Sequence, residues 1–321
     1  MSVRSTLTRA SVLIAAGLAA ALTLSACGSS DPLASGSSAS SAAASSGASG
    51  SDSAAGGPII IGSANFPESA LLANIYAAAL KAKGVDVSTN LNIGSREIYI
   101  KALQDGSIDL VPEYSGVLLQ YFDPTATAVS SDDVYTALVA KTPSGLKVLT
   151  KSAAEDKDAV VVTKATADAN NLTSIADLAP VASTFILGGP PEWATRPTGV
   201  PGLKEKYGLT FKEFKALDAG GPLTLGALTS DQIQAGNLFT TDPSIPANNL
   251  VVLEDPKNLF AAQNVLPLIN AAKSSPQVEA ALDAVSAKLD TATLTQLLTK
   301  VQVDKEDSAQ VAQEWVAANL Q

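Results

Sequence analysis

One arginine and one tyrosine are the side chains best suited to hold a small solute. Arg196 stands between Thr195 and Pro197, and an arginine whose fork is fixed by neighbouring turns suits two-point capture of a carboxylate. Tyr114 offers a ring face that can hold a quaternary ammonium group by cation–π attraction. Each has an ordinary alternative, because Arg196 could lie on the surface or pair with Glu192, and Tyr114 could be a partly buried packing residue.

Further polar candidates stand next to predicted strand ends and helix starts. Ser63 and Asn65, just before a predicted helix, can offer hydroxyl, amide and backbone donors to a ligand, or simply cap that helix. Thr240 follows a predicted strand, where it could contact ligand, cap the next turn or line a hinge. Asp158 ends a charged loop and could face a cation, or be solvated.

Composition excludes most catalytic chemistry. The 321 residues include no histidine and one cysteine, so His-based triads, His-ligated zinc, cysteine zinc clusters and internal disulfides are out of reach. We therefore predict no catalytic residue, no metal site and no cofactor. The chain has 21 basic and 31 acidic residues, a net charge of -10, which argues against nucleic acid as a partner.

The first 57 residues have the composition of a targeting region. A basic start, an apolar core over residues 12–24 and the sequence Leu24-Ser-Ala-Cys27 predict a signal peptide over residues 1–26. The sequence Leu24-Ser-Ala-Cys27 resembles the bacterial lipobox, and this resemblance implies acylation of Cys27. The alternative is that Cys27 is merely a small apolar residue at the end of the signal. Residues 27–57, nearly all Ser, Ala and Gly, predict a flexible tether.

An α/β pattern begins at residue 58. Apolar runs predict strands at 59–61, 85–91 and 108–111, separated by helices over 68–83 and 95–105, the second with Ile98 and Leu103 on its inner face and a stop at Gly106. Such β-α-β units predict mainly parallel sheets. Pro112 is expected to end the third strand. Tyr114 would then lie at the carboxyl edge of a sheet, where open α/β folds place ligands.

The second half of the chain continues the alternation. Further strands are predicted at 146–149, 159–162, 185–187, 211–216, 234–239, 249–253 and 265–269, with a turn over 188–191. A helix is predicted near 223–228, and residues 276–320 form a helical tail. Two α/β lobes joined by two crossings are the expected design.

Five short sequence blocks stand out along the chain. They are Gly62-Ser-Ala-Asn-Phe-Pro-Glu68, Gly94-Ser-Arg-Glu97, Asp109-Leu-Val-Pro-Glu-Tyr-Ser-Gly116, Pro191-Glu-Trp-Ala-Thr-Arg-Pro197 and Thr240-Thr-Asp242. In order and spacing they resemble the periplasmic binding proteins of glycine betaine, choline and carnitine ABC transporters. Each block alone is weak, whereas five in register over roughly residues 58–320 are strong evidence.

The resemblance implies a two-lobed periplasmic-binding-protein fold of type II. Lobe 1 would comprise residues 58–156 and 262–321, and lobe 2 residues 157–261. The ligand would lie between the lobes, which would close on it about the two crossings.

The resemblance also implies roles for single residues. In that family the arginine that matches Arg196 contacts the ligand carboxylate, and several tyrosines surround the trimethylammonium group. Here Tyr114 holds one of the tyrosine positions and Phe239 a second, while Asp158 and Gln263 hold the other two. Two more positions depart from the pattern, since Ala64 replaces a lysine and Val117 a threonine. Glycine betaine is therefore predicted to bind weakly.

Three neighbouring residues are assigned to structure rather than to ligand binding. Arg96 and Glu97 lie on the first turn of the helix over 95–105, where they can pair with each other or with Glu113. Trp193 is predicted to pack, because the family often has another aromatic residue there without a direct ligand role.

The implied function is transport. The chain resembles a lipid-anchored receptor, on the extracytoplasmic face of the cell membrane, that delivers a small osmoprotectant-like solute to an ABC permease in the cytoplasmic membrane. It would act as a monomer and without catalysis. An alternative keeps the fold but gives it another polar or aromatic ligand, because the tyrosine cage is incomplete. A remote alternative is a secreted hydrolase that uses Ser115, although the Gly-x-Ser-x-Gly elbow and a histidine base are missing.

Overall fold

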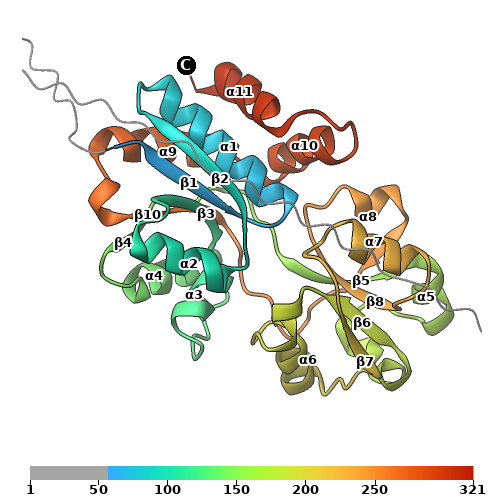
Figure 1. Ribbon diagram of the computed structural model, residues 1–321. Coiled ribbons are helices and arrows are strands. Elements are labelled where there is room, and N and C mark those ends of the chain that lie inside the picture. The colour runs from blue at the N-terminus through green and yellow to red at the C-terminus, as the bar shows by residue number, and fades with distance from the viewer. Residues whose placement is uncertain (1–56, 321) are drawn as a thin grey trace, which may run out of the picture. The chain divides into compact units, whose positions relative to one another are not determined.

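Two five-stranded sheets organise residues 57–320, the part of the chain that this computed structural model describes (Figure 1). The first sheet has the order β2-β1-β3-β10-β4 and contains β1 (Ile59–Ala64), β2 (Val87–Gly94), β3 (Leu110–Tyr114), β4 (Leu146–Val148) and β10 (Val265–Asn270). The second has the order β7-β6-β8-β5-β9 and contains β5 (Asp158–Thr163), β6 (Ile186–Gly189), β7 (Glu213–Ala216), β8 (Ala235–Phe239) and β9 (Leu250–Val252). The predicted signal peptide, Cys27 and the tether up to Gly56 lie outside the described residues.

Both sheets are mixed, and in each one strand runs against the other four, which agrees with the prediction of mainly parallel sheets. Strand β1 is parallel to β2 and β3, and β6 is parallel to β7 and β8, as the β-α-β units predict. Strand β10 is antiparallel to β3 and β4, and β5 is antiparallel to β8 and β9. The reversed strands are β5 and β10, and each enters its sheet from the other lobe, without a crossover helix to impose parallel direction.

The chain passes between the sheets twice, and the two passages lie side by side. It leaves the first sheet after β4 and returns from the second before β10, which confirms the two predicted crossings and the two-lobed fold. An antiparallel bridge joins Glu155 to Asn264, and the Asp156 N–H donates to the Gln263 carbonyl at 3.1 Å. The exact lobe boundaries, 156/157 and 261/262, stay a prediction.

Helices cover both faces of the first sheet (Figure 1). One face carries α1 (Pro67–Ala82), α9 (Pro276–Lys288), α10 (Thr291–Gln302) and α11 (Ser308–Asn319), which pack together in one apolar cluster. The other carries α2 (Arg96–Asp105), α3 (Ser115–Phe122) and α4 (Ser131–Lys141). The 3₁₀ turn η4 (Ala271–Lys273) leads into α9. The predicted helical tail therefore packs against lobe 1. Within residues 57–320, no helix has the length and apolarity needed to span a membrane.

The second sheet is covered by shorter helices. These are α5 (Lys164–Asn170), α6 (Val200–Tyr207), α7 (Pro222–Thr229) and α8 (Ser244–Ala247), with 3₁₀ turns η1 (Ile175–Leu178), η2 (Ala182–Thr184) and η3 (Pro191–Ala194). On η3 the ring of Trp193 is 1% exposed and stacks on Phe260 at 6.4 Å, which confirms that it packs. The predicted turn over 188–191 is wrong in its first half, because Gly188 and Gly189 belong to β6.

Helix α2 begins after Ser95 and ends at Gly106, whose φ of 80° is the left-handed conformation that glycine adopts easily. Its buried face carries Tyr99 and Leu103, whereas Ile98 is 54% exposed, so the predicted inner face is wrong. Five residues separate Ile98 from Leu103, about 140° around a helix, so the two cannot share one face.

Pro112 lies inside β3 and does not end it. It faces Pro267 of the antiparallel neighbour β10. Because antiparallel strands exchange N–H bonds only at alternate facing pairs, two prolines suit a pair at which neither residue donates. Strand β3 therefore continues to Tyr114, and α3 starts directly behind it.

Candidate ligand-binding site

A cavity lies between the lobes, beside the two crossings. Six of the eight predicted ligand-binding residues line it: Asn65, Tyr114, Asp158, Arg196, Phe239 and Gln263. Ala64 and Val117, which stand at the departing positions, line it as well. This cavity has a volume of about 60 Å³ and a second, adjoining one about 230 Å³, and both are lined by Arg96, Val117 and Arg196.

Three aromatic rings form one wall of the cavity. Tyr114 comes from the end of β3 and Phe239 from the end of β8, as predicted, and Phe66 stands between them. The Phe66 ring centroid lies 5.0 Å from that of Phe239 and 6.1 Å from that of Tyr114. Sequence reasoning missed Phe66 as part of the wall, although an aromatic residue two positions after β1 is expected at the same sheet edge as Tyr114. Gly220 (φ 64°) leaves room for the ring of Phe239, because a Cβ at this position would lie 2.7 Å from the ring.

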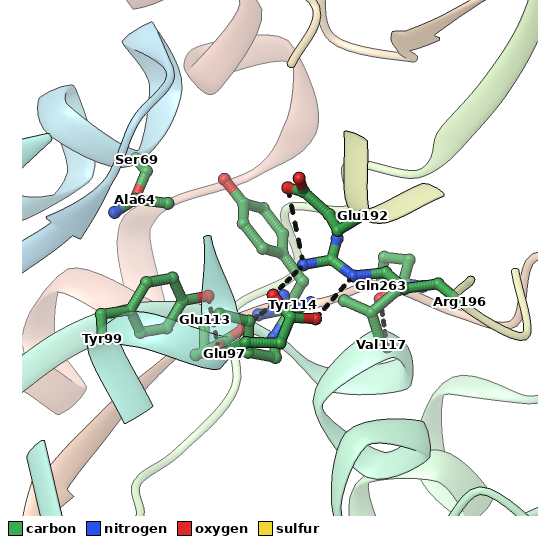
Figure 2. A network of polar contacts seen from close by, with 11 residues as sticks. Ala64, Ser69, Glu97, Tyr99, Glu113, Tyr114, Val117, Glu192, Arg196 and Gln263 are labelled. Atoms are coloured by element: carbon green, nitrogen blue, oxygen red, sulfur yellow. Dashed lines mark hydrogen bonds and ion pairs between the residues drawn. The ribbon is translucent and has the colours of Figure 1, made fainter. Parts of the chain in front are cut away.

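Arg196 is paired with Glu97, from the opposite lobe (Figure 2). Its Nε and Nη2 donate to the two carboxylate oxygens of Glu97, each at 3.0 Å. Glu192, one of the alternatives from the sequence, lies farther away, at 3.7 Å. Partial burial raises the pKa of Glu97, but hydrogen bonds from Arg196 and Ser95 outweigh it and bring the pKa to about 2. The predicted carboxylate receptor thus already holds a carboxylate of the same chain.

The second arginine of the cavity, Arg96, is also paired with a carboxylate. Its Nε and Nη2 donate to Glu113 at 2.8 and 2.9 Å, and both residues are buried. The Tyr99 hydroxyl and the Tyr114 N–H complete the bonds to this carboxylate, at 2.7 and 3.0 Å. Burial lowers the pKa of Arg96, but the Glu113 charge raises it above its usual value. The predicted pairing of Arg96 with Glu113 is confirmed. The alternative pairing of Arg96 with Glu97 is wrong, because Glu97 binds Arg196 instead.

Two buried carboxyl groups meet at the first crossing behind Tyr114. Glu68, in the first turn of α1, and Asp156 are hydrogen-bonded to each other, and burial raises the pKa of both. The Tyr114 hydroxyl donates to Glu68 at 2.7 Å and the Thr241 hydroxyl at 2.5 Å. Asp156 Oδ1 in turn accepts from the Thr240 hydroxyl at 3.2 Å and from the Thr241 N–H at 3.1 Å, so each carboxyl of the pair has two further donors.

Asp158 and Gln263, which are predicted to replace two tyrosines of the family, bring polar groups to the cavity wall. Asp158 accepts a bond from the Asn237 Nδ2 at 2.9 Å, and burial raises its pKa. It forms no ion pair within the described part of the chain. Gln263 is 1% exposed and its Oε1 accepts from the Val117 N–H at 3.0 Å, in the first turn of α3. This bond orients Gln263 at the cavity wall.

Ser63 and Thr240 are not among the residues that line the cavity. The buried Ser63 hydroxyl donates to the Ala64 carbonyl at 2.9 Å and accepts from the Asn92 N–H at 2.8 Å, so it ties β1 to β2. It does not cap α1 either. The Thr240 hydroxyl accepts from the Lys157 N–H at 2.9 Å, which places Thr240 at the first crossing, one of its three predicted alternatives.

Comparison with known proteins agrees with this geometry. Residues 57–318 match the family OpuAC, described as the substrate binding domain of an ABC-type glycine betaine transport system. The chain is 28% identical over 276 residues to the glycine betaine-binding protein YehZ of Escherichia coli, covering 82% of this chain and 90% of that protein. A glycine-betaine-binding protein of Pseudomonas aeruginosa is 28% identical, over 80% of this chain and 86% of its own.

A solved structure shows the same fold. The crystal structure of a glycine betaine/carnitine/choline ABC transporter protein has a TM-score of 0.64 and 21% identity, and the match covers 81% of this chain and 98% of that one. A type II two-lobed fold and a family match over most of the chain lead to one conclusion. The chain belongs to the family of substrate-binding domains of ABC-type glycine betaine transport systems.

Proposed function

We propose that this protein is an extracytoplasmic solute-binding lipoprotein that captures a small quaternary amine between its lobes and delivers it to an ABC permease. The observation that carries the proposal is the wall of Phe66, Tyr114 and Phe239 at a cavity that both lobes line. Three ring faces suit an alkylated cation, because each can contribute about 0.5 to 2 kcal/mol of cation–π attraction. Membership of the family supports the transport role.

The rest of the proposal concerns location. The sequence Leu24-Ser-Ala-Cys27 supports a lipid anchor at Cys27 on the outer face of the cytoplasmic membrane. The Ser/Ala/Gly-rich tether, with a root-mean-square reach on the order of 30 Å, would hold the lobes near a permease in that membrane. A monomer meets this need, because both walls of the cavity come from one chain.

The hydrolase alternative loses support, because its candidate nucleophile is buried. Ser115 is fully buried; its hydroxyl donates to the Ala262 carbonyl at 3.1 Å and accepts from the Asn264 N–H at 3.0 Å. A serine held in this way is not presented to a substrate. The alternative of a different polar or aromatic ligand keeps its place beside the quaternary amine, because rings and polar groups both line the cavity.

Mass spectrometry of small molecules that co-purify with the protein tests the proposal, together with a thermal-shift panel of choline, glycine betaine, carnitine and aromatic solutes. A quaternary amine at 100 times its Kd should add about 2.7 kcal/mol to the free energy of unfolding, which is a measurable shift. Stabilisation by aromatic solutes alone, with no response to any quaternary amine, would favour the alternative ligand class.

A further inference from the structure

The cations that line the cavity are already neutralised by carboxylates of the chain itself. Arg96 holds Glu113 and Arg196 holds Glu97, both in two-point contacts with distances from 2.8 to 3.0 Å. A carboxylate on a ligand can therefore take the Nε and Nη2 side of Arg196 only by displacing Glu97. This exchange replaces one ion pair by another of the same chemistry, so it adds little binding free energy.

In the described part of the chain, the cavity wall includes carboxyl groups without an ion pair and a buried amide oxygen without a hydrogen-bond partner. Asp158 has no ion pair within residues 57–320, and the buried carboxyl pair Glu68–Asp156 lies behind Tyr114, whose hydroxyl donates to Glu68. Asn237 is fully buried, and its Oδ1 has no hydrogen-bond partner among the described residues. Its Nδ2 bonds to Asp158 Oδ1 and to the Leu238 carbonyl, at 2.9 and 3.4 Å, which fixes the orientation of the amide.

An unpaired buried acceptor restricts the ligand further. A hydroxyl can donate to Asn237 Oδ1, whereas an ionised carboxylate has acceptors only and would leave this oxygen unpaired. The three ring faces and the carboxylates favour a positive charge on the same ligand.

We infer that Glu97 is an internal carboxylate that occupies Arg196 and thereby makes the cavity selective for hydroxylated quaternary cations over those that carry a carboxylate. This inference rests on the proposed function and names the substrate class of the same site. The inference also gives one explanation for Ala64 and Val117, which are predicted to replace a lysine and a threonine of the family. Both replacements remove polar groups from the cavity wall.

The position of Glu97 explains why it can act as a competitor. Its side chain is 42% exposed, so water can take up its charge if it swings away, and Arg196 remains 22% exposed in the opposite lobe. Both cavities are lined by Arg196, and Glu97 lines the second one. The ion pair thus stands where the two cavities adjoin, and a ligand that leaves it intact is confined to the aromatic side.

The test compares choline, which has a hydroxyl, with glycine betaine, which has a carboxylate. Calorimetry on the purified chain, stripped of bound solute, gives the ratio of the two Kd values for the wild type, Glu97→Gln and Glu205→Gln. Glu205 lies exposed on α6 outside the cavity, so its variant controls for the loss of one negative charge. The wild type and the control should bind choline about tenfold or more tightly than glycine betaine, and Glu97→Gln should shift the ratio about tenfold towards betaine.

The outcomes separate the two claims. If both solutes bind and Glu97→Gln leaves the ratio as in the control, the inference is wrong and the proposed function stands. Glycine betaine that binds the wild type as tightly as choline would also overturn it. If neither solute binds the wild type or the control, the proposed quaternary amine function fails, and the inference fails with it.

Discussion

At the residue scale, Tyr114 links the cavity to the crossing. Its ring faces Phe66, while its hydroxyl donates to Glu68, which in turn receives the Thr241 hydroxyl of the opposite lobe. A change at the ring is therefore transmitted to a contact between the lobes. This arrangement distinguishes Tyr114 from Phe239, which has no hydroxyl and contributes a ring alone.

The cleanest residue-scale prediction therefore concerns the two phenylalanines. Phe66→Ala and Phe239→Ala should each weaken choline binding by about 1 to 2 kcal/mol, because each removes one cation–π face. Calorimetry measures the loss, and Phe122→Ala, which removes a ring of lobe 1 outside the cavity, is the control. Unchanged affinity in Phe66→Ala would mean that its ring only supports Phe239.

Sequence reasoning located most of the wall but not the pairing of its charges. Tyr114, Phe239, Asp158 and Gln263 could be found from the order of the family blocks, which fixes the positions along the chain. The contact of Arg196 with Glu97 joins residues 99 positions apart and from different lobes, so no local pattern reveals it. Their pairing depends on how the lobes meet.

At the scale of elements, the bond between Arg96 on α2 and Glu113 on β3 holds the helix to the sheet edge. Arg96→Met should lower the free energy of unfolding by about 3 to 5 kcal/mol, because it leaves the buried Glu113 charge without its partner. Urea unfolding measures this loss, with Lys101→Met on the exposed side of α2 as control. Adding Glu113→Gln should recover part of the stability, and a double variant no better than the single one would contradict the account.

The carboxyl pair between α1 and the first crossing predicts a pH dependence. Burial raises the folded-state pKa of Glu68 and Asp156, so above the ordinary carboxyl pKa of about 4 the folded chain binds more protons than the unfolded chain. The free energy of unfolding should therefore fall as the pH rises through the window between the ordinary and the raised values.

Asp156→Asn removes one of these titrating groups and keeps an amide donor for Glu68. Its Tm should fall less than that of the wild type between about pH 4.5 and about pH 8. Asp158 and Asp242, whose pKa values burial also raises, stay in both proteins, so part of the dependence remains. Parallel Tm curves for the two proteins would show that the pair does not share a proton.

Elements with clear periodicity could be predicted, and short or polar ones could not. The apolar runs of β1, β3 and β10 and the spacing in α1 follow directly from the sequence. Helices α5 and α6 have seven and eight residues with few apolar side chains, and were missed for that reason. Strand direction depends on which lobe a strand comes from, and local sequence does not encode it.

At the scale of the whole molecule, polar side-chain contacts join the lobes beside the cavity. They include Arg196 with Glu97 and Thr241 with Glu68, and a separation of the lobes must break both of these. A ligand that contacts both lobes stabilises their closed arrangement. Small-angle scattering should therefore give a smaller radius of gyration with saturating choline than without it, and equal radii would count against closure about the two crossings.

The proposed membrane location depends on Cys27, which lies outside the described residues. Cys27→Ala should release the protein from the membrane fraction, because the thiol to which a lipid would be attached is gone. Fractionation and labelling with palmitate check this, and Ser25→Thr, a change beside it that keeps the cysteine, is the control. Acylation that persists in Cys27→Ala would refute the proposed anchor.

The most direct test of the central claim is titration calorimetry of choline into the purified chain. The account predicts one choline bound per chain, with a negative change in heat capacity because the aromatic wall becomes buried against the ligand. It further predicts that Tyr114→Ala weakens this binding, because a ring of the wall is lost. Absence of saturable binding by choline, or binding that Tyr114→Ala does not weaken, would contradict capture of a quaternary amine between the lobes.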